Sequence, residues 1–142
     1  MLTTALMCFV ISVTNGDTLV ASCDHHQIVV RLAEIDAPEK RQRFGLDLKL
    51  SLSEICLNKN AEVAPKSKDS HGRTVAYVTC EGIDANTEQI KRGMAWVFDK
   101  YVTNKGLYDI QNKAKSSQSG LWRLDSPTPP WEWRKNTPAP KL

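Results

Sequence analysis

Acidic and basic side chains gather in three short segments of this chain: Gly16-Asp17-Thr18, Arg31–Glu39 and His71-Gly72-Arg73. The middle segment sets an arginine, an aspartate and a glutamate at the end of an otherwise apolar run. Hydrolysis of a phosphodiester needs a group that takes a proton from water, and cations that balance the charge building on the phosphate oxygens. The residue types in these segments are those that phosphodiester hydrolysis requires.

Asp17 and Asp36 are the candidate ligands of a metal ion. Asp17 follows the Asn15-Gly16 turn and Asp36 ends a predicted strand, so both can reach one point at the edge of a small barrel. Two carboxylates, the backbone carbonyl of Ala37 and water would give the all-oxygen surroundings that calcium or magnesium prefers. Alternatively, the two aspartates only form turns, as aspartate commonly does.

Glu39 is the candidate general base, because Pro38 stiffens the turn that presents it. Arg31 and Arg73 are the candidate phosphate-binding arginines, since guanidinium matches phosphate oxygens in bidentate fashion. Each has a structural alternative: Glu39 as a surface residue beside a basic loop, and Arg73 as a solvated strand end. Arg31 faces the predicted core, where an ion pair with Glu34 or an aspartate would equally explain it.

The four cysteines lack the Cys-x-x-Cys spacing of zinc sites. Asn15-Gly16 is a strong hairpin signal, and a two-residue turn there places Cys8 directly opposite Cys23. Cys56 and Cys80 then remain as the second pair. Two disulfides indicate an oxidising compartment, the periplasm or the exterior. The alternative is four reduced, buried cysteines in a cytosolic protein.

Apolar alternation and helical periodicity divide most of the chain into strands and helices. A helix is predicted at 44–57, although alternating leucines there also allow a strand. The order of elements predicts an α+β fold, a five-stranded OB-fold barrel with three α-helices. The predicted strands are Cys8–Thr14, Thr18–Cys23, Gln27–Ile35, Ala61–Lys66 and Thr74–Cys80, and the other helices cover 84–93 and 105–117.

Residues 8–125 are predicted to form this single domain, and 126–142 a tail rich in proline and tryptophan. Five of the seven prolines lie in the tail, so we expect it to continue neither a helix nor a sheet. Because a disordered tail seldom carries two tryptophans, we expect it to dock as far as about residue 134, with 136–142 loose. We expect Met1–Met7 to lie outside the structured domain.

The composition is that of one globular domain, with 41% hydrophobic and 25% charged residues. The net charge of +3 suits a polyanionic partner but is weak evidence by itself. No run of eighteen apolar residues exists, so no membrane-spanning helix is predicted. The apolar start Met1–Ile11 has neither the basic residues nor the cleavage site of a signal peptide. We expect a monomer by default.

The charged segments described above and several later motifs resemble those of the staphylococcal nuclease-like (thermonuclease) family, and they occur in the same order and at similar spacing. The tail resembles that of exported bacterial members. The resemblance covers about residues 8–134. The motifs that carry it are Gly16-Asp17-Thr18, Arg31-Leu-x-x-Ile-Asp36-Ala-Pro-Glu39, Gly72-Arg73-x-x-Ala76-Tyr77, Asp84-Ala-Asn86, Arg92-Gly93-Met94-Ala95-Trp96, Gly120-Leu121-Trp122 and Pro130-Trp131-Glu132-Trp133-Arg134.

The resemblance implies an OB-fold barrel with three helices and calcium-dependent cleavage of DNA and RNA, with magnesium or manganese as alternative ions. By position, Asp17, Asp36 and the Ala37 carbonyl would bind calcium, Glu39 would be the base, and Arg31 and Arg73 would stabilise the transition state.

Three substitutions depart from the family pattern. Asn15 stands where many relatives have aspartate, Ala37 replaces a threonine found in some members, and His71 replaces a common tyrosine. We predict that His71, Tyr101 and Lys40 contact the substrate, although His71 could equally be a solvated turn residue.

A non-catalytic OB-fold module that binds single-stranded nucleic acid is the rival interpretation. Such modules carry aromatic platforms on their strands, whereas the aromatics here concentrate at 96–101 and in the tail. The paired aspartates would also repel phosphate unless a metal lies between them. A third interpretation, a secreted inhibitor or structural protein, leaves Arg31 and Glu39 without a task.

Overall fold

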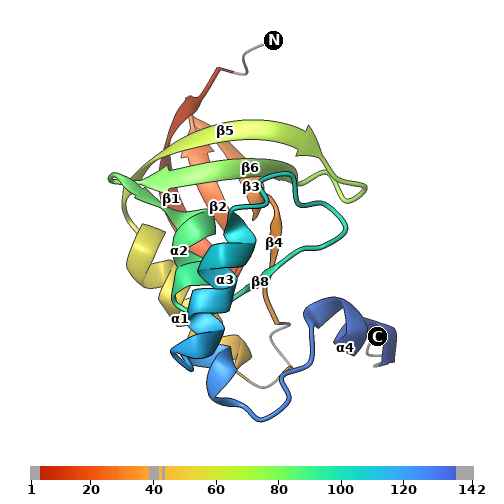
Figure 1. Ribbon diagram of the computed structural model, residues 1–142. Coiled ribbons are helices and arrows are strands. Elements are labelled where there is room, and N and C mark those ends of the chain that lie inside the picture. Colours follow the sequence, from red (N-terminus) through yellow and green to blue (C-terminus); the bar gives the residue numbers. More distant parts are fainter. Residues whose placement is uncertain (1–3, 39–41, 43, 137–142) are drawn as a thin grey trace.

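Five strands close into a barrel in the computed structural model, which describes residues 4–38, 42 and 44–136 (Figure 1). Neighbouring strands pair antiparallel in the order β3-β2-β1-β5-β6, and a parallel pairing of β3 with β6 closes the ring. This is the predicted OB-type barrel. Its strands are β1 (Leu6–Asn15), β2 (Thr18–Cys23), β3 (His26–Leu32), β5 (Asn60–Lys68) and β6 (Thr74–Cys80).

Shorter elements extend and cover the barrel. The strands β4 (Ile35–Asp36) and β8 (Trp96–Val97) form a sheet of their own, and β7 (Ile83–Asp84) pairs with β6. In Figure 1, α1, α2 and α3 gather below the barrel, and α4 lies to one side of them. The helical elements are α1 (Gly45–Cys56), α2 (Ala85–Lys91), α3 (Leu107–Ser116), the 3₁₀ turn η1 (Gly120–Arg123) and α4 (Pro130–Asn136).

The leucines of α1 show why this segment is a helix rather than a strand. Leu48 and Leu52 are fully buried, whereas Leu46 and Leu50 are more than half exposed. Residues four apart share one face of a helix, so two leucines point to the core and two to solvent. Ile55 extends the buried face onto the barrel core.

The β1–β2 hairpin turns one residue later than the sequence predicts. Asn15 pairs with Thr18, so Gly16 and Asp17 form the turn, and two irregularities in β1 restore the register further along. Each bulge adds one residue to β1 without a partner in β2. Cys8 therefore still faces Cys23, as predicted, although the turn itself was predicted at the wrong residues.

Both predicted disulfides are present, Cys8–Cys23 and Cys56–Cys80, with Cα–Cα distances of 4.3 and 5.3 Å. The first joins the ends of β1 and β2 that lie away from the hairpin turn. The second ties the last residue of α1 to the last residue of β6.

Two further predictions of the elements are wrong. The first strand begins at Leu6, which pairs with Val63, so structure starts before residue 8. The predicted strand Gln27–Ile35 is broken at residues 33–34, because Glu34 adopts a positive φ of 67°. Asp36 therefore lies on the separate strand β4, where it pairs with Trp96.

The tail contains a fourth α-helix, contrary to the expectation that its prolines allow neither a helix nor a sheet. Pro130 is the first residue of α4, a position where the missing N–H costs nothing and the fixed φ is already helical. None of the helices in the described part of the chain has the length and apolar character that crossing a bilayer requires.

Candidate active site

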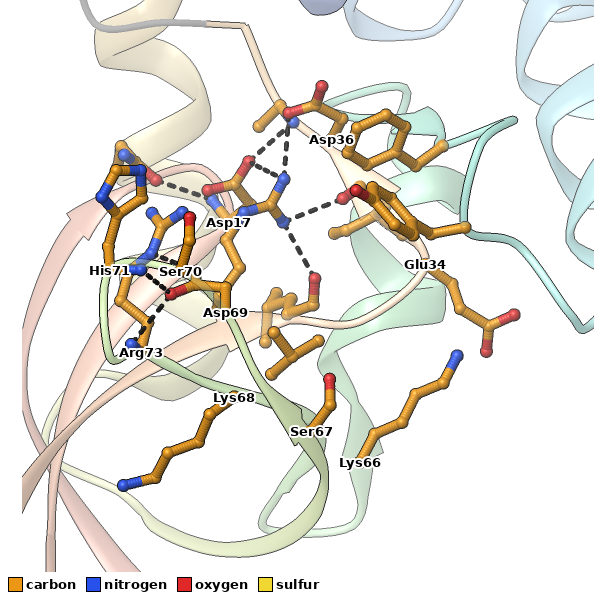
Figure 2. Close-up of a pocket in the computed structure, with 18 of the residues that line it drawn as sticks. Asp17, Glu34, Asp36, Lys66, Ser67, Lys68, Asp69, Ser70, His71 and Arg73 are labelled. Atoms are coloured by element: carbon orange, nitrogen blue, oxygen red, sulfur yellow. Dashed lines mark hydrogen bonds and ion pairs between the residues drawn. The ribbon is translucent and has the colours of Figure 1, made fainter.

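One cleft of about 810 Å³ brings together residues from five separate stretches of the chain (Figure 2). Glu39 and Lys40 lie outside the described residues. The other predicted site residues all line this cleft: Asp17, Arg31, Asp36, Ala37, His71, Arg73 and Tyr101.

Asp17 is fixed by the tight packing of the hairpin turn. A Cβ on Gly16 would lie 2.8 Å from Cβ of Leu48 and 2.9 Å from Cβ of Ala37, so only glycine allows this approach. The buried Gln89 side chain donates to the Gly16 carbonyl at 2.8 Å, which ties the turn to α2. The Asp17 amide donates to Oδ1 of Asn15 at 3.1 Å, so Asn15 shapes the turn.

Arg31 joins the two aspartates. Its Nη2 lies 3.0 Å from Oδ1 of Asp36 and 3.4 Å from Oδ2 of Asp17. Its Nη1 donates to the carbonyls of Leu32 and Ile35, both at 2.9 Å. The sequence allowed an ion pair of Arg31 with Glu34 or with an aspartate, and the structure shows the pair with the aspartates. The guanidinium is held by the turn between β3 and β4.

Asp36 is 1% exposed and is bound by two arginines. Besides Arg31, Arg134 of α4 pairs with its Oδ2, and Nη1 of Arg134 lies 3.3 Å from Oδ1. Burial raises the pKa of the Asp36 carboxyl to about 6, although the hydrogen bond from Arg134 and the charge of Arg31 act to lower it. At neutral pH the group is mostly ionised, and its charge is balanced by these guanidinium groups.

Arg73 lines the same cleft as Arg31 because β6 closes the barrel against β3. Val30 pairs with Thr74, which places Arg73 next to the stretch of β3 that carries Arg31. Nε of Arg73 donates to Oδ2 of Asp69 at 2.7 Å. No other partner of its guanidinium is seen among the described residues, so both terminal nitrogens can meet a phosphate.

Glu34 connects the strands of the site to the loop that follows β8. One carboxylate oxygen accepts from the amide and hydroxyl of Thr103 and from the amide of Asn104, and the other accepts from the Tyr77 hydroxyl at 2.6 Å. Burial acts to raise the pKa of Glu34, but these hydrogen bonds outweigh it and lower the pKa to about 2. Glu34 thus anchors the loop that carries Tyr101.

The walls of the cleft suit a polyanion with flat bases. Figure 2 shows Lys66 and Lys68 on the side of the cleft away from Asp17 and Asp36. Tyr101, 54% exposed, packs edge-on against Phe98, with ring centroids 5.0 Å apart. Lysines can balance phosphate charge, and an exposed aromatic ring can stack on a base.

The two aspartates fit a hard divalent cation. Both are buried, both offer oxygen, and one oxygen of each already lies within 3.4 Å of a single positively charged nitrogen. Among residues 4–38, 42 and 44–136, no group of three His, Cys, Asp or Glu side chains is placed to hold a metal ion. The pair would need backbone oxygen, water or substrate to complete a coordination shell.

Sequence reasoning missed two contacts of this site. The first is the ion pair of Asp69 with Arg73, although an aspartate four residues before an arginine is a signal for a local ion pair. Arg134 was placed in the docked tail with no role assigned. No local pattern indicates that it reaches Asp36, 98 residues earlier in the chain.

Comparison with known proteins agrees with this arrangement. Residues 29–124 match the model of the family described as "Staphylococcal nuclease homologue". A Haemophilus influenzae protein named "Uncharacterized endonuclease" is 40% identical over 129 residues, which cover 90% of this chain and 72% of that protein. A "Micrococcal nuclease" of Shigella flexneri is 30% identical over 137 residues, covering 89% and 79%. The chain therefore belongs to the staphylococcal nuclease homologue family.

Proposed function

We propose that this protein is a calcium-dependent endonuclease that hydrolyses the phosphodiester bonds of DNA and RNA. The observation that carries the proposal is the convergence of Asp17, Arg31 and Asp36 in a cleft that Arg73 also lines. The names of the relatives, an endonuclease and a micrococcal nuclease, support the reaction. Calcium is proposed from the all-oxygen donors, and magnesium or manganese are the alternatives.

Asp17, Asp36 and the Ala37 carbonyl would hold the cation. When bound, the cation supplies positive charge next to the scissile phosphate and lowers the pKa of water. With the charge of the aspartates balanced in this way, Arg31 can also donate to a phosphate oxygen while it stays bound to its two backbone carbonyls. Arg73 donates with its two terminal nitrogens, and both arginines oppose the charge that builds in the transition state. Glu39 takes the proton of the attacking water.

Beyond the metal site and the two arginines, the walls of the cleft would hold the rest of the substrate. Tyr101 and His71 would contact bases or sugars, and Lys40, Lys66 and Lys68 would contact phosphates. We also propose that the protein works in the periplasm or outside the cell, which the two disulfides support.

A cleavage assay tests the function. Single-stranded DNA, duplex DNA and RNA are incubated with calcium, magnesium or manganese, and with excess chelator. We expect cleavage with calcium and none with chelator. Glu39→Gln and Arg73→Ala should each lower kcat at least about a hundredfold, as expected for the loss of one positioned catalytic group. Arg123→Ala, an exposed arginine of η1 outside the cleft, is the matched control and should cleave normally.

Different failures have different meanings. Cleavage that persists in chelator would contradict the metal requirement, and full activity in Glu39→Gln would reject that residue as the base. Tight binding of single strands without cleavage, in every metal, would instead favour the non-catalytic OB-fold module.

A further inference from the structure

The helix α4 lies against the proposed active site. The indole of Trp131 stacks on Phe98, with centroids 5.5 Å apart and an interplanar angle of 3°, and meets Trp96 edge-on at 5.8 Å. Phe98 lines the cleft, and Trp96 is the strand partner of Asp36. The segment before the helix is also held, because Gln42 donates to the carbonyl of Thr128 at 2.8 Å. These contacts bring the end of α4 to Asp36.

Both oxygens of Asp36 are occupied by guanidinium groups. Arg134 contacts Oδ2 and Oδ1, and Arg31 contacts Oδ1. The side chains of the two arginines differ in exposure. Arg31 is also bound to two backbone carbonyls, and its side chain is 12% exposed, whereas the Arg134 side chain is 39% exposed on a short helix.

We propose that Arg134 is a further residue of the active site, which competes with the divalent cation for Asp36 and so sets the affinity of the site for calcium. This inference rests on the proposed function. A cation bound between the two aspartates needs oxygen that Arg134 now contacts, and two positive groups cannot share that oxygen without repulsion. Arg134 is the partner that gives way, since it is the more exposed of the two arginines.

The competition is reciprocal. If Arg134 weakens calcium binding, calcium must weaken the hold of α4 on the cleft by the same factor. The environment of Trp131 then changes when calcium binds, because the indole loses its stacking on Phe98. Calcium should therefore alter the tryptophan fluorescence of the protein, and the change should be absent in Trp131→Phe.

Calcium titration by calorimetry, without nucleic acid, tests the proposal on the full chain. We expect Arg134→Gln to bind calcium about tenfold more tightly than the unaltered protein, within the usual range of coupling between two sites. Trp131→Ala, which keeps Arg134 but removes the stacking, should also bind more tightly. Lys135→Gln removes the same charge from the neighbouring residue of α4 and should bind calcium normally. Circular dichroism and thermal melting show that each variant is folded.

The outcomes separate this inference from the proposed function. Calcium binding that is unchanged or weaker in Arg134→Gln overturns the role of Arg134 and leaves the endonuclease proposal intact. An equal gain in Lys135→Gln also overturns it, since net charge alone would then explain the effect. If neither the unaltered protein nor any variant binds calcium, the proposed metal site fails, and this inference fails with it.

Discussion

Arg73 depends on Asp69 for its position. Oδ1 of Asp69 accepts from the amides of His71 and Arg73, at 2.9 and 3.0 Å, while Oδ2 accepts from Nε of Arg73. Burial acts to raise the pKa of Asp69, but the hydrogen bonds from Arg73 and His71 lower it below its usual value. Asp69 is therefore ionised at neutral pH and orients the guanidinium from within the same turn.

Two substitutions of Asp69 should separate its two tasks. Asp69→Asn keeps an oxygen for the turn amides but loses the charged partner of Arg73, and Asp69→Ala loses both. We expect kcat to fall about threefold in the first and about thirtyfold in the second, because small displacements of a positioned group are costly. Steady-state kinetics on a single-stranded oligonucleotide measure both.

Calcium affinity provides the control, since no contact between Asp69 and either Asp17 or Asp36 is seen in the described structure. Equal losses of kcat in the two variants would contradict a separate contribution of the turn amides, and a weaker calcium affinity in Asp69→Asn would contradict a role confined to the turn that carries Arg73.

At the scale of elements, the turn between β3 and β4 holds much of the site. It begins directly after Leu32, the residue that follows Arg31, contains Glu34 at a positive φ, and leads into β4, which carries Asp36. The Glu34 carboxylate anchors it to residues 103 and 104, and Arg31 binds its carbonyls. A rigid turn of this kind sets the distance between the guanidinium of Arg31 and the carboxylate of Asp36.

Removal of the Glu34 carboxylate should destabilise the protein. Glu34→Ala leaves two amides and a hydroxyl in a part-buried place without their acceptor, so we expect the free energy of unfolding to fall by about 3 kcal/mol. Tyr77→Phe removes only one of the hydrogen bonds, from a partly exposed ring, and should cost at most about 1 kcal/mol. Urea denaturation measures both, and equal losses in the two variants would contradict the assignment of the anchor to Glu34.

The β1–β2 hairpin shows what a sequence pattern can and cannot predict about an element. Alternation identified both strands, and the Asn-Gly signal located the turn to within one residue. The bulges in β1 were not predictable, because they depend on how β1 packs in the closed barrel rather than on any local motif. The pairing of Cys8 with Cys23 was predicted correctly because the bulges offset the error in the turn.

At the scale of the molecule, the barrel and the residues of the cleft were predictable because apolar alternation and three spaced motifs are local signals. The structure of the tail was not predictable, since a proline-rich composition does not indicate a short helix that begins with proline. Its contact with Asp36 depends on the stacking of Trp131 on Phe98, a tertiary contact. Long-range contacts of exposed polar side chains leave no periodic trace in a sequence, which is why Arg134 was missed.

The two disulfides lie at the end of the barrel opposite the site. Cys8 and Cys23 end the hairpin whose turn carries Asp17, and Cys80 ends the strand that begins after Arg73. Stability and catalysis should therefore respond separately to their loss. Each bond closes a short stretch of chain, with sequence separations of 15 and 24 residues.

Replacing either pair, Cys8→Ala with Cys23→Ala or Cys56→Ala with Cys80→Ala, should lower the free energy of unfolding by about 3 kcal/mol, because the unfolded chain gains the freedom of the opened loop. Below the melting temperature kcat should remain unchanged, since the far end of the barrel keeps its geometry. Urea denaturation and cleavage assays at low temperature measure the two effects. A large loss of kcat in a variant that is still folded would show that the disulfides position the site as well as stabilise the barrel. Alkylation with and without reductant, followed by mass measurement, should find four thiols only after reduction, and thiols found before reduction would remove the argument for an oxidising compartment.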